Sequence, residues 1–175
     1  GGGMRPNEHS DLDKVFKTWG VKLRKDKIAG DLGTARRVNV RVGERLAVAD
    51  YVAWLALRPG NFDRTNAVMS DLQVLNVASA GILEEVKGKS TNLTPLIQTG
   101  MRSMEIDASK VRTQPDVVGL FREFKPSGQP FTLAASVTGK VDSAFPEGPP
   151  KPLQGKDEAE NKKNQEAYDK AKQEH

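Results

Sequence analysis

The chain has 175 residues, of which 37% are hydrophobic and 29% are charged, with a formal net charge of +4 and no cysteine. This composition predicts one soluble domain with a polar tail, and the lack of cysteine excludes disulfides, thiol catalysis and thiolate metal sites. The basic residues are scattered, so we expect no nucleic-acid partner. The two histidines, His9 and His175, lie near the ends, which argues against a catalytic triad or a histidine-ligated metal.

The first predicted element is an amphipathic helix over Ser10–Trp19. Ser10 and Asp13 form a variant of the capping box that starts helices. Apolar residues recur at helical spacing, at Leu12, Val15, Phe16 and Trp19. Gly20 supplies the left-handed conformation that commonly ends a helix. We therefore expect a helix that lies on the core, with its aromatic side chains packed inward.

Two strand predictions follow the helix. Val21–Ile28 predicts a short strand that ends in a turn at Lys25–Lys27. Val38–Val42 alternates apolar and polar residues, which is typical of a half-buried strand, and a turn at Gly43 then predicts a hairpin. The nearby arginines are consistent with an anion-binding cluster or with charges that protect a sheet edge, and we favour the second interpretation: Arg36, Arg37 and Arg41.

The longest apolar run in the chain is Leu46–Leu57, which Asp50 alone interrupts. Both alternating sets of residues are apolar, which is typical of a strand that is buried on both faces. The alanines also fit a buried helix, whereas the β-branched and aromatic residues favour a strand. We therefore predict that this run is the central strand of a sheet.

Helices and strands continue to alternate after this run. We predict helices over Asn66–Leu75 and Asp116–Phe124, strands over Val77–Leu83, Leu93–Thr99 and Pro130–Val137, and a helical turn near Asp107–Val111. Residues 1–5 resemble an added spacer, and residues 6–145 are predicted to form the α/β domain. Residues 146–175 combine a proline- and glycine-rich linker with a charged tail that lacks an apolar stripe, so we expect disorder there.

No catalytic motif is visible in the sequence, but one carboxylate needs an explanation. Asp50 lies inside the apolar run, so it requires a hydrogen-bond or cationic partner or an exposed position. The neighbouring Tyr51 and Trp54 suit the face of a sugar, and with Asn61 they are our candidate ligand-binding residues. The structural explanation, an aspartate paired with an arginine or a backbone amide, competes with this hypothesis. We expect no catalytic residue, metal or cofactor.

Four segments of the sequence resemble a known family. They read S-D-L-D-K-V-F-K-T-W-G-V, then D-Y-V-A-W-L-A-L-R-P-G-N-F-D, then L-N-V-A-S-A-G-I-L, and finally L-T-P-L-I-Q-T-G. Together they resemble the GldG-like family, whose members are auxiliary components of uncharacterised ABC-type transport systems named for a gliding-motility apparatus. The resemblance extends from about Pro6 to Phe145.

This resemblance implies a non-enzymatic domain that binds a partner subunit or a substrate such as a glycan. It implies permease and ATPase subunits as partners and a parent protein anchored at the periplasmic face of the inner membrane. The alternative function is a hydrolase of carbohydrate or ester bonds that uses carboxylates such as Asp50, Asp63 and Asp71.

The resemblance also implies the fold. We expect a truncated Rossmann-like or GATase-like α/β domain, with a mixed sheet centred on residues 46–57 and flanking helices. The family's preceding strands and glycine-rich loop have no counterpart before Ser10 in this sequence. An exposed sheet edge is therefore expected, and through it a homodimer.

Overall fold

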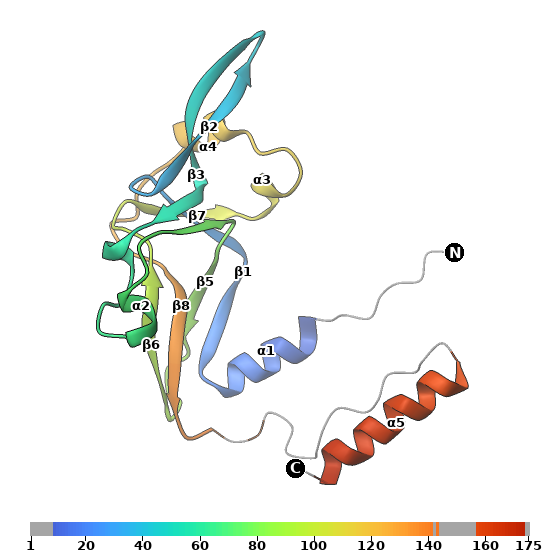
Figure 1. Cartoon of the computed structure of the whole chain (residues 1–175). Coiled ribbons are helices and arrows are strands. Elements are labelled where there is room, and N and C mark those ends of the chain that lie inside the picture. Colours follow the sequence, from blue (N-terminus) through green and yellow to red (C-terminus); the bar gives the residue numbers. More distant parts are fainter. Residues whose placement is uncertain (1–8, 142, 144–156, 174–175) are drawn as a thin grey trace. The chain divides into compact units, whose positions relative to one another are not determined.

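The strands of this protein form two antiparallel sheets. The computed structural model describes residues 9–141, 143 and 157–173, and the side chains only from Asp13 onward. The chain divides into two compact units, Gly1–Lys140 and Val141–His175. The first unit contains both sheets, which are five-stranded in the order β6-β8-β5-β1-β7 and three-stranded in the order β2-β3-β4 (Figure 1).

The elements of the first unit follow one another in short segments. The strands are β1 (Val21–Asp31), β2 (Ala35–Val42), β3 (Arg45–Leu57), β4 (Leu75–Ala78), β5 (Gly81–Glu85), β6 (Thr91–Gln98), β7 (Ser103–Asp107) and β8 (Thr132–Gly139). The helices are α1 (His9–Thr18), η1 (Pro59–Asn61), α2 (Ala67–Ser70), α3 (Ser109–Arg112) and α4 (Val117–Arg122). The second unit contains one helix, α5 (Glu158–Gln173).

The predicted α/β class is confirmed, but the strands are arranged differently from the expectation. Every strand pair among the described residues is antiparallel, so the mixed, Rossmann-like sheet is a wrong prediction. A parallel pair needs a crossover of a dozen or more residues, usually a helix. The helices between the strands have only three to six residues, which favours hairpins and turns instead.

The apolar run is a strand as predicted, yet only its second half is buried. Val52, Ala53, Leu55 and Leu57 are at most 1% exposed, whereas Leu46 is 77% exposed. The reason is that β4 pairs only with Trp54–Leu57 and α4 packs against β3, so the core covers the second half of the strand alone. The prediction of burial on both faces is therefore wrong for residues 46–51 and also at Trp54, which is 36% exposed.

The buried half of β3 belongs to two hydrophobic clusters. Val52 and Ala53 pack with Ile28, Ile106 and Leu120, which brings together β1, β7 and α4. A second cluster contains Leu55, Leu57, Phe62 and Ile97. Each fully buried leucine or valine stabilises the fold by roughly 1.5–3 kcal/mol. This half of β3 therefore connects the small sheet to the large one.

Strand β1 is longer than predicted and lies between β5 and β7. Val21–Leu23 and Ile28 pair with β5, with an irregular register between Leu23 and Ile28, and Lys27–Asp31 pair with β7. The predicted turn is in fact this irregularity, where Asp26 adopts a φ of +54°. The backbone oxygen of Asp26 accepts a hydrogen bond from the Ala108 amide at 2.9 Å, which fixes the distortion. Strand β1 thus pairs with both β5 and β7.

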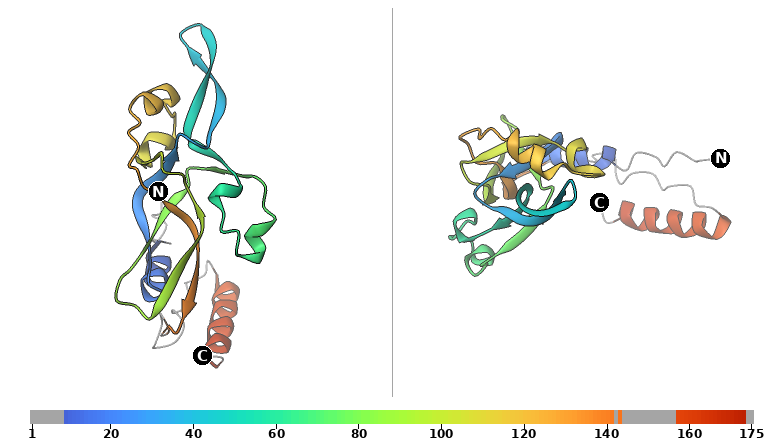
Figure 2. Two further views of the ribbon diagram at one scale, coloured as in Figure 1. Left: turned by 90° about the vertical axis from the view of Figure 1, so that its left-hand side faces the viewer. Right: turned by 90° about the horizontal axis from the view of Figure 1, so that it is seen from above.

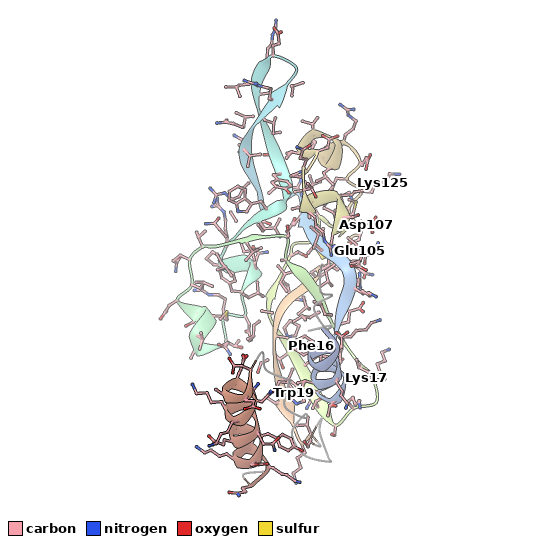
Figure 3. All side chains as sticks on the ribbon, turned by 90° about the vertical axis from the view of Figure 1, so that its right-hand side faces the viewer. Phe16, Lys17, Trp19, Glu105, Asp107 and Lys125 are labelled. Atoms are coloured by element: carbon pink, nitrogen blue, oxygen red, sulfur yellow. The ribbon has the colours of Figure 1, made fainter. Side chains whose placement is uncertain are left out.

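Helices α1 and α4 confirm their predictions closely. Helix α1 ends before Gly20, whose φ is +73° as expected for a helix-ending glycine. Trp19, however, is 43% exposed, so it is not the core residue that the periodicity predicted (Figure 3). Helix α4 is capped by Asp116, whose carboxylate accepts a hydrogen bond from the Gly119 amide at 2.8 Å.

Three segments differ from their predicted elements. The helix capped by Asn66 has four residues only, and of the rest of the predicted span only Leu75 belongs to a strand, β4. The predicted strand Val77–Leu83 divides between β4 and β5, which belong to different sheets. Strand β7 occupies a stretch for which no strand was predicted. Short apolar stretches of this kind contain too little periodicity to show which sheet they join.

The charged tail is helical where disorder was expected. Helix α5 has 16 residues and none of them is buried. Glu158 and Glu160 in its first turn and Lys170 and Lys172 in its last turn complement the helix dipole, which favours a helix without a core. The predicted spacer at residues 1–5 and most of the predicted linker lie outside the described residues.

A buried carboxylate joins two turns at the end of β1. Asp31 is 0% exposed, and its two oxygens accept hydrogen bonds from the amides of Gly33 and Gly100, each at 2.7 Å. The Thr34 hydroxyl donates a third at 3.2 Å. A Cβ atom at either glycine would lie 3.2 Å from a carboxylate oxygen, so small residues favour this close approach. Asp31 thereby fixes the point where the chain enters β2.

Replacing Asp31 by Asn tests this role. The amide keeps one accepting oxygen and presents an NH₂ group to the second backbone donor, which leaves that donor unpaired. We expect the free energy of unfolding to fall by about 1.5–3 kcal/mol. Urea unfolding followed by circular dichroism measures the change. Asp71→Asn, at an exposed position, is the matched control, and an equal loss in the two variants would contradict the proposed role.

Candidate functional site

The β2–β3 hairpin extends beyond the rest of its sheet (Figures 1 and 2). Its far half, residues 38–49, carries three large apolar side chains that are exposed: Val42 at 54%, Leu46 at 77% and Val48 at 66%. Residues opposite each other on paired strands share a face, and neighbours along a strand alternate between faces. Leu46 and Val48 therefore lie on one face of the hairpin and Val42 lies on the other.

The hairpin also has two free edges over this length. Strand β2 pairs with β3 alone, and β4 reaches only Trp54–Leu57, so Arg45–Tyr51 pair on one side only among the described residues. An isolated two-stranded hairpin is marginally stable in water. The far half of this hairpin consequently offers backbone and apolar surface that the domain itself does not cover.

The charged side chains near the base of the hairpin are paired within it. Arg37 lies 3.6 Å from Asp50, and both side chains are partly exposed. The guanidinium of Arg36 stacks over the ring of Trp54, 4.8 Å from its centroid. Such exposed contacts contribute little stability each. Their effect is to fix the directions of these side chains at the base of the hairpin.

The structure separates Asn61 from the other three candidate ligand-binding residues. Asp50, Tyr51 and Trp54 lie on β3, where Asp50 has Arg37 as its partner and Trp54 is 36% exposed. Tyr51 is half-buried against the core, and this burial raises the pKa of its hydroxyl. Asn61 lies in η1, where it accepts a hydrogen bond from the Arg58 amide at 3.0 Å and donates one to the Gln98 carbonyl at 2.9 Å.

Asn61 instead lines an open cavity of about 570 Å³ beside β6. Its lining residues are Gly60, Asn61, Phe62, Asp63, Thr94, Pro95, Leu96, Gln98, Thr99, Gly100, Met101 and Pro130. One oxygen of Asp63 accepts hydrogen bonds from the hydroxyl and amide of Thr65, which lower the pKa of this carboxyl. Asp63 thus stabilises a turn. The other candidates, Asp50, Tyr51 and Trp54, are not among the lining residues.

The described residues contain no group of three or more side chains that could hold a metal ion. Within the same part of the chain, no helix has the length and apolar character that crossing a membrane requires. Among the described side chains, every buried polar nitrogen or oxygen has a hydrogen-bond partner. Buried polar groups with unused bonding capacity are common in reactive sites, so this arrangement is typical of a structural interior.

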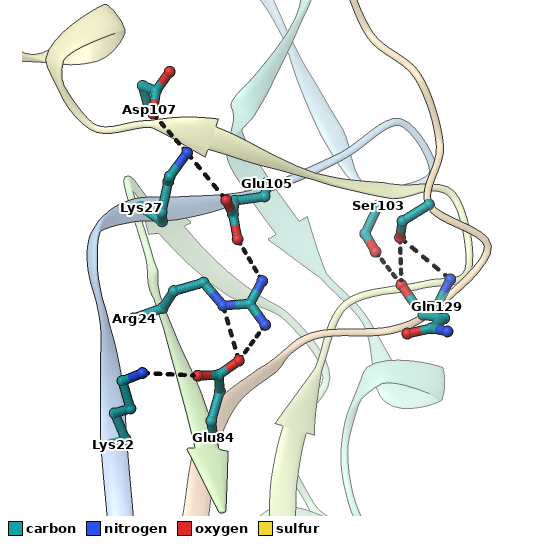
Figure 4. A network of polar contacts seen from close by, with 9 residues as sticks. Lys22, Arg24, Lys27, Glu84, Ser103, Glu105, Asp107 and Gln129 are labelled. Atoms are coloured by element: carbon teal, nitrogen blue, oxygen red, sulfur yellow. Dashed lines mark hydrogen bonds and ion pairs between the residues drawn. The ribbon is translucent and has the colours of Figure 1, made fainter.

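A charged network crosses the large sheet (Figure 4). Six side chains of alternating sign come from β1, β5 and β7, namely Lys22, Arg24, Lys27, Glu84, Glu105 and Asp107. Arg24 bridges Glu84 and Glu105, and Lys27 lies 3.1 Å from Glu105 and 2.7 Å from Asp107. All six charges are compensated, so the network joins three strands rather than offering a charge to a ligand.

The ion pairs of the network lower the pKa values of two of its carboxyl groups. Burial alone would raise the pKa of Glu105, but the hydrogen bonds from Arg24 and Lys27 outweigh it and the pKa is lowered. A hydrogen bond from Lys27 lowers the pKa of Asp107. Carboxylates with lowered pKa values stabilise the fold above their ordinary pKa, about 4. This stabilisation is lost as the pH falls through the lowered values.

The sequence of this chain matches one known protein family. The fold and the site define an α/β domain with a projecting hairpin. The chain belongs to the family described as "ABC-type uncharacterized transport system", whose model matches residues 1–171. It is thus an auxiliary component of an ABC-type transport system, as the resemblance implied. The match extends past Phe145 and includes the tail.

No curated protein and no solved structure matches this chain. Membership of this family supports a role in transport and points to a non-enzymatic function. The residues that carry out this role have to be inferred from the structure.

Glu105→Gln tests the charged network. The neutral amide loses its ion pairs with Arg24 and Lys27, so we expect lower stability than wild type at pH 7. We also expect a smaller loss of stability between pH 7 and pH 3, because one titrating group is gone. Urea unfolding at several pH values measures both effects. Glu85→Gln, at an exposed position of β5, is the control, and the network has no structural role if the two variants behave alike.

Proposed function

We propose that this domain is a non-enzymatic binding component of its ABC transport system and that it holds a protein subunit through the β2–β3 hairpin. The observation that carries this proposal is the exposure of Val42, Leu46 and Val48 on two faces of one projecting hairpin. Exposed apolar groups that lie together commonly mark interaction surfaces, whereas single ones need no explanation. Covering them on association gains roughly 25 cal/mol for each Å² of apolar surface.

The finer assignment follows the resemblance to the GldG-like family. This resemblance implies a parent protein at the periplasmic face of the inner membrane, permease and ATPase subunits as partners, and gliding motility as one setting. A domain in that position meets the permease directly, because the ATPase subunits lie on the other side of the membrane. We therefore propose the permease as the subunit that the hairpin contacts.

A glycan-binding role is the second candidate. Trp54 is 36% exposed and shares β3 with Asp50 and Tyr51, and aromatic and polar groups of this kind suit a sugar face. Arg36 stacks on the Trp54 ring, however, and Asn61 lies apart in the cavity. The carbohydrate or ester hydrolase has no support in the described residues, since the Asp50 carboxylate is paired with Arg37 and that of Asp63 with Thr65.

Site-specific photocrosslinking tests the protein-binding proposal. A photoreactive amino acid replaces Val48 in the full-length parent protein, which is expressed in its source cells. We expect an adduct with a subunit of the ABC transport system, identified by mass spectrometry. The same replacement at Lys22, whose side chain is 66% exposed on the large sheet, is the control.

Two outcomes contradict this proposal. Equal adducts from positions 48 and 22 would show unspecific proximity, and an absence of adducts from position 48 would show that the hairpin has no protein partner.

An adduct of two copies of the chain would indicate the homodimer that the exposed edges also allow. Light scattering over a range of concentrations then distinguishes a stable dimer from a monomer.

The glycan alternative has its own test. If Trp54 binds a sugar, Trp54→Ala abolishes the glycan-array signal of the protein while its circular dichroism spectrum stays unchanged. Trp19→Ala, which removes the other tryptophan at an exposed position, is the matched control. We expect no array signal for the wild type, because we assign the hairpin to a protein partner. A signal that only Trp54→Ala removes would favour the glycan.

A further inference from the structure

We infer that the partner holds the hairpin tip in an apolar cleft that is flanked by carboxylates on both sides. This inference rests on the proposed function and specifies the chemistry of the partner surface. The inference depends on three properties of the hairpin. These are its use of arginine as the basic residue, the arginines that form no ion pair, and the face of the hairpin on which each of those arginines lies.

The hairpin uses arginine exclusively as its basic residue. The chain has sixteen lysines and eleven arginines, yet residues 28–86 contain no lysine, and β2 and β3 carry four arginines: Arg36, Arg37, Arg41 and Arg45. Arginine is enriched and lysine depleted at protein–protein interfaces. A guanidinium is weakly hydrated and forms two parallel hydrogen bonds with a carboxylate. This composition therefore favours a protein partner that presents carboxylates.

The charged side chains at the hairpin tip form no ion pairs with other described residues. The hairpin contains four arginines and two acidic residues, Glu44 and Asp50, so it has an excess of two positive charges. Asp50 pairs with Arg37, and Arg36 stacks on Trp54. In the part of the chain that the structure describes, neither Arg41 nor Arg45 forms an ion pair. These two guanidinium groups are thus available to acidic groups of another molecule.

The strand register distributes these two arginines over both faces. Arg41 lies opposite Leu46, and Val42 lies opposite Arg45. Residues that lie opposite each other share a face, so each face of the tip combines one exposed apolar side chain with one arginine. A flat partner surface could contact only one face. A cleft with apolar walls and a carboxylate on each side covers both.

The same features argue against two other occupants. A second copy of the hairpin would bring the same excess of positive charge, and like charges repel. The three carboxylates of the charged network on the large sheet are already paired, so they are not free for a second copy: Glu84, Glu105 and Asp107. Segments that insert into a lipid surface commonly carry tryptophan or phenylalanine, whereas the tip, residues 41–46, has no aromatic residue and includes Glu44.

Zero-length crosslinking with a carbodiimide tests the carboxylate rim. This reagent joins a lysine amine to a carboxylate but does not react with arginine, so Arg41→Lys and Arg45→Lys each place a reactive amine at the tip. The variants are expressed in the full-length parent in source cells, and linked peptides are identified by mass spectrometry. We expect amide bonds from positions 41 and 45 to Asp or Glu of the protein that position 48 photocrosslinks. Arg64→Lys, outside the hairpin, is the matched control.

Charge reversal provides the second measurement. We expect Arg41→Glu with Arg45→Glu to reduce the photocrosslinking yield from position 48 roughly tenfold, as loss of interfacial ion pairs predicts. Arg64→Glu should leave the yield unchanged. If position 48 still forms its adduct but positions 41 and 45 form no amide and reversal has no effect, the acidic cleft is wrong and the proposed function stands. If position 48 forms no adduct, the proposed function itself fails.

Discussion

The structure depends on the buried carboxylate of Asp31, which accepts backbone hydrogen bonds from two separate turns. One turn leads from β1 into β2, and the other joins β6 to β7. Because a carboxylate inside a protein is costly unless it is fully hydrogen-bonded, both turns must keep their amides directed at it. The glycines at these positions permit the close approach. The hairpin consequently projects from a fixed base, and a fixed binding element loses less conformational entropy on association.

Strand β3 combines two roles along its length. Its second half supplies Leu55 and Leu57 to the core, while its first half carries Leu46 and Val48 into solvent. The same apolar pattern thus stabilises the fold in one half and remains uncovered in the other. Exposed strand edges invite pairing with other chains, so proteins normally shorten or cover them. A long uncovered hairpin is therefore more consistent with a binding element than with a structural one.

The distribution of ion pairs supports the same conclusion. In the network on the large sheet, cations and carboxylates alternate across β1, β5 and β7, and each of its six charges has a partner. At the hairpin tip, Arg41 and Arg45 have no such partner within the described residues. Charged residues are frequent throughout this sequence, so their number alone does not distinguish the two regions. Only the pairing in three dimensions separates a structural network from an available surface.

The sequence by itself determined the α/β class, the helices α1 and α4 with their ends at Gly20 and Asp116, the hairpin at Gly43, and the family. These features depend on local signals, namely capping, glycine conformation and hydrophobic period. Tertiary structure alone decided that β4 and β5 belong to different sheets, that Asp31 joins two turns, and that residues 46–48 are exposed. Each of these depends on contacts between residues far apart in the chain, and hydrophobic periodicity shows that a face is apolar without showing what covers it.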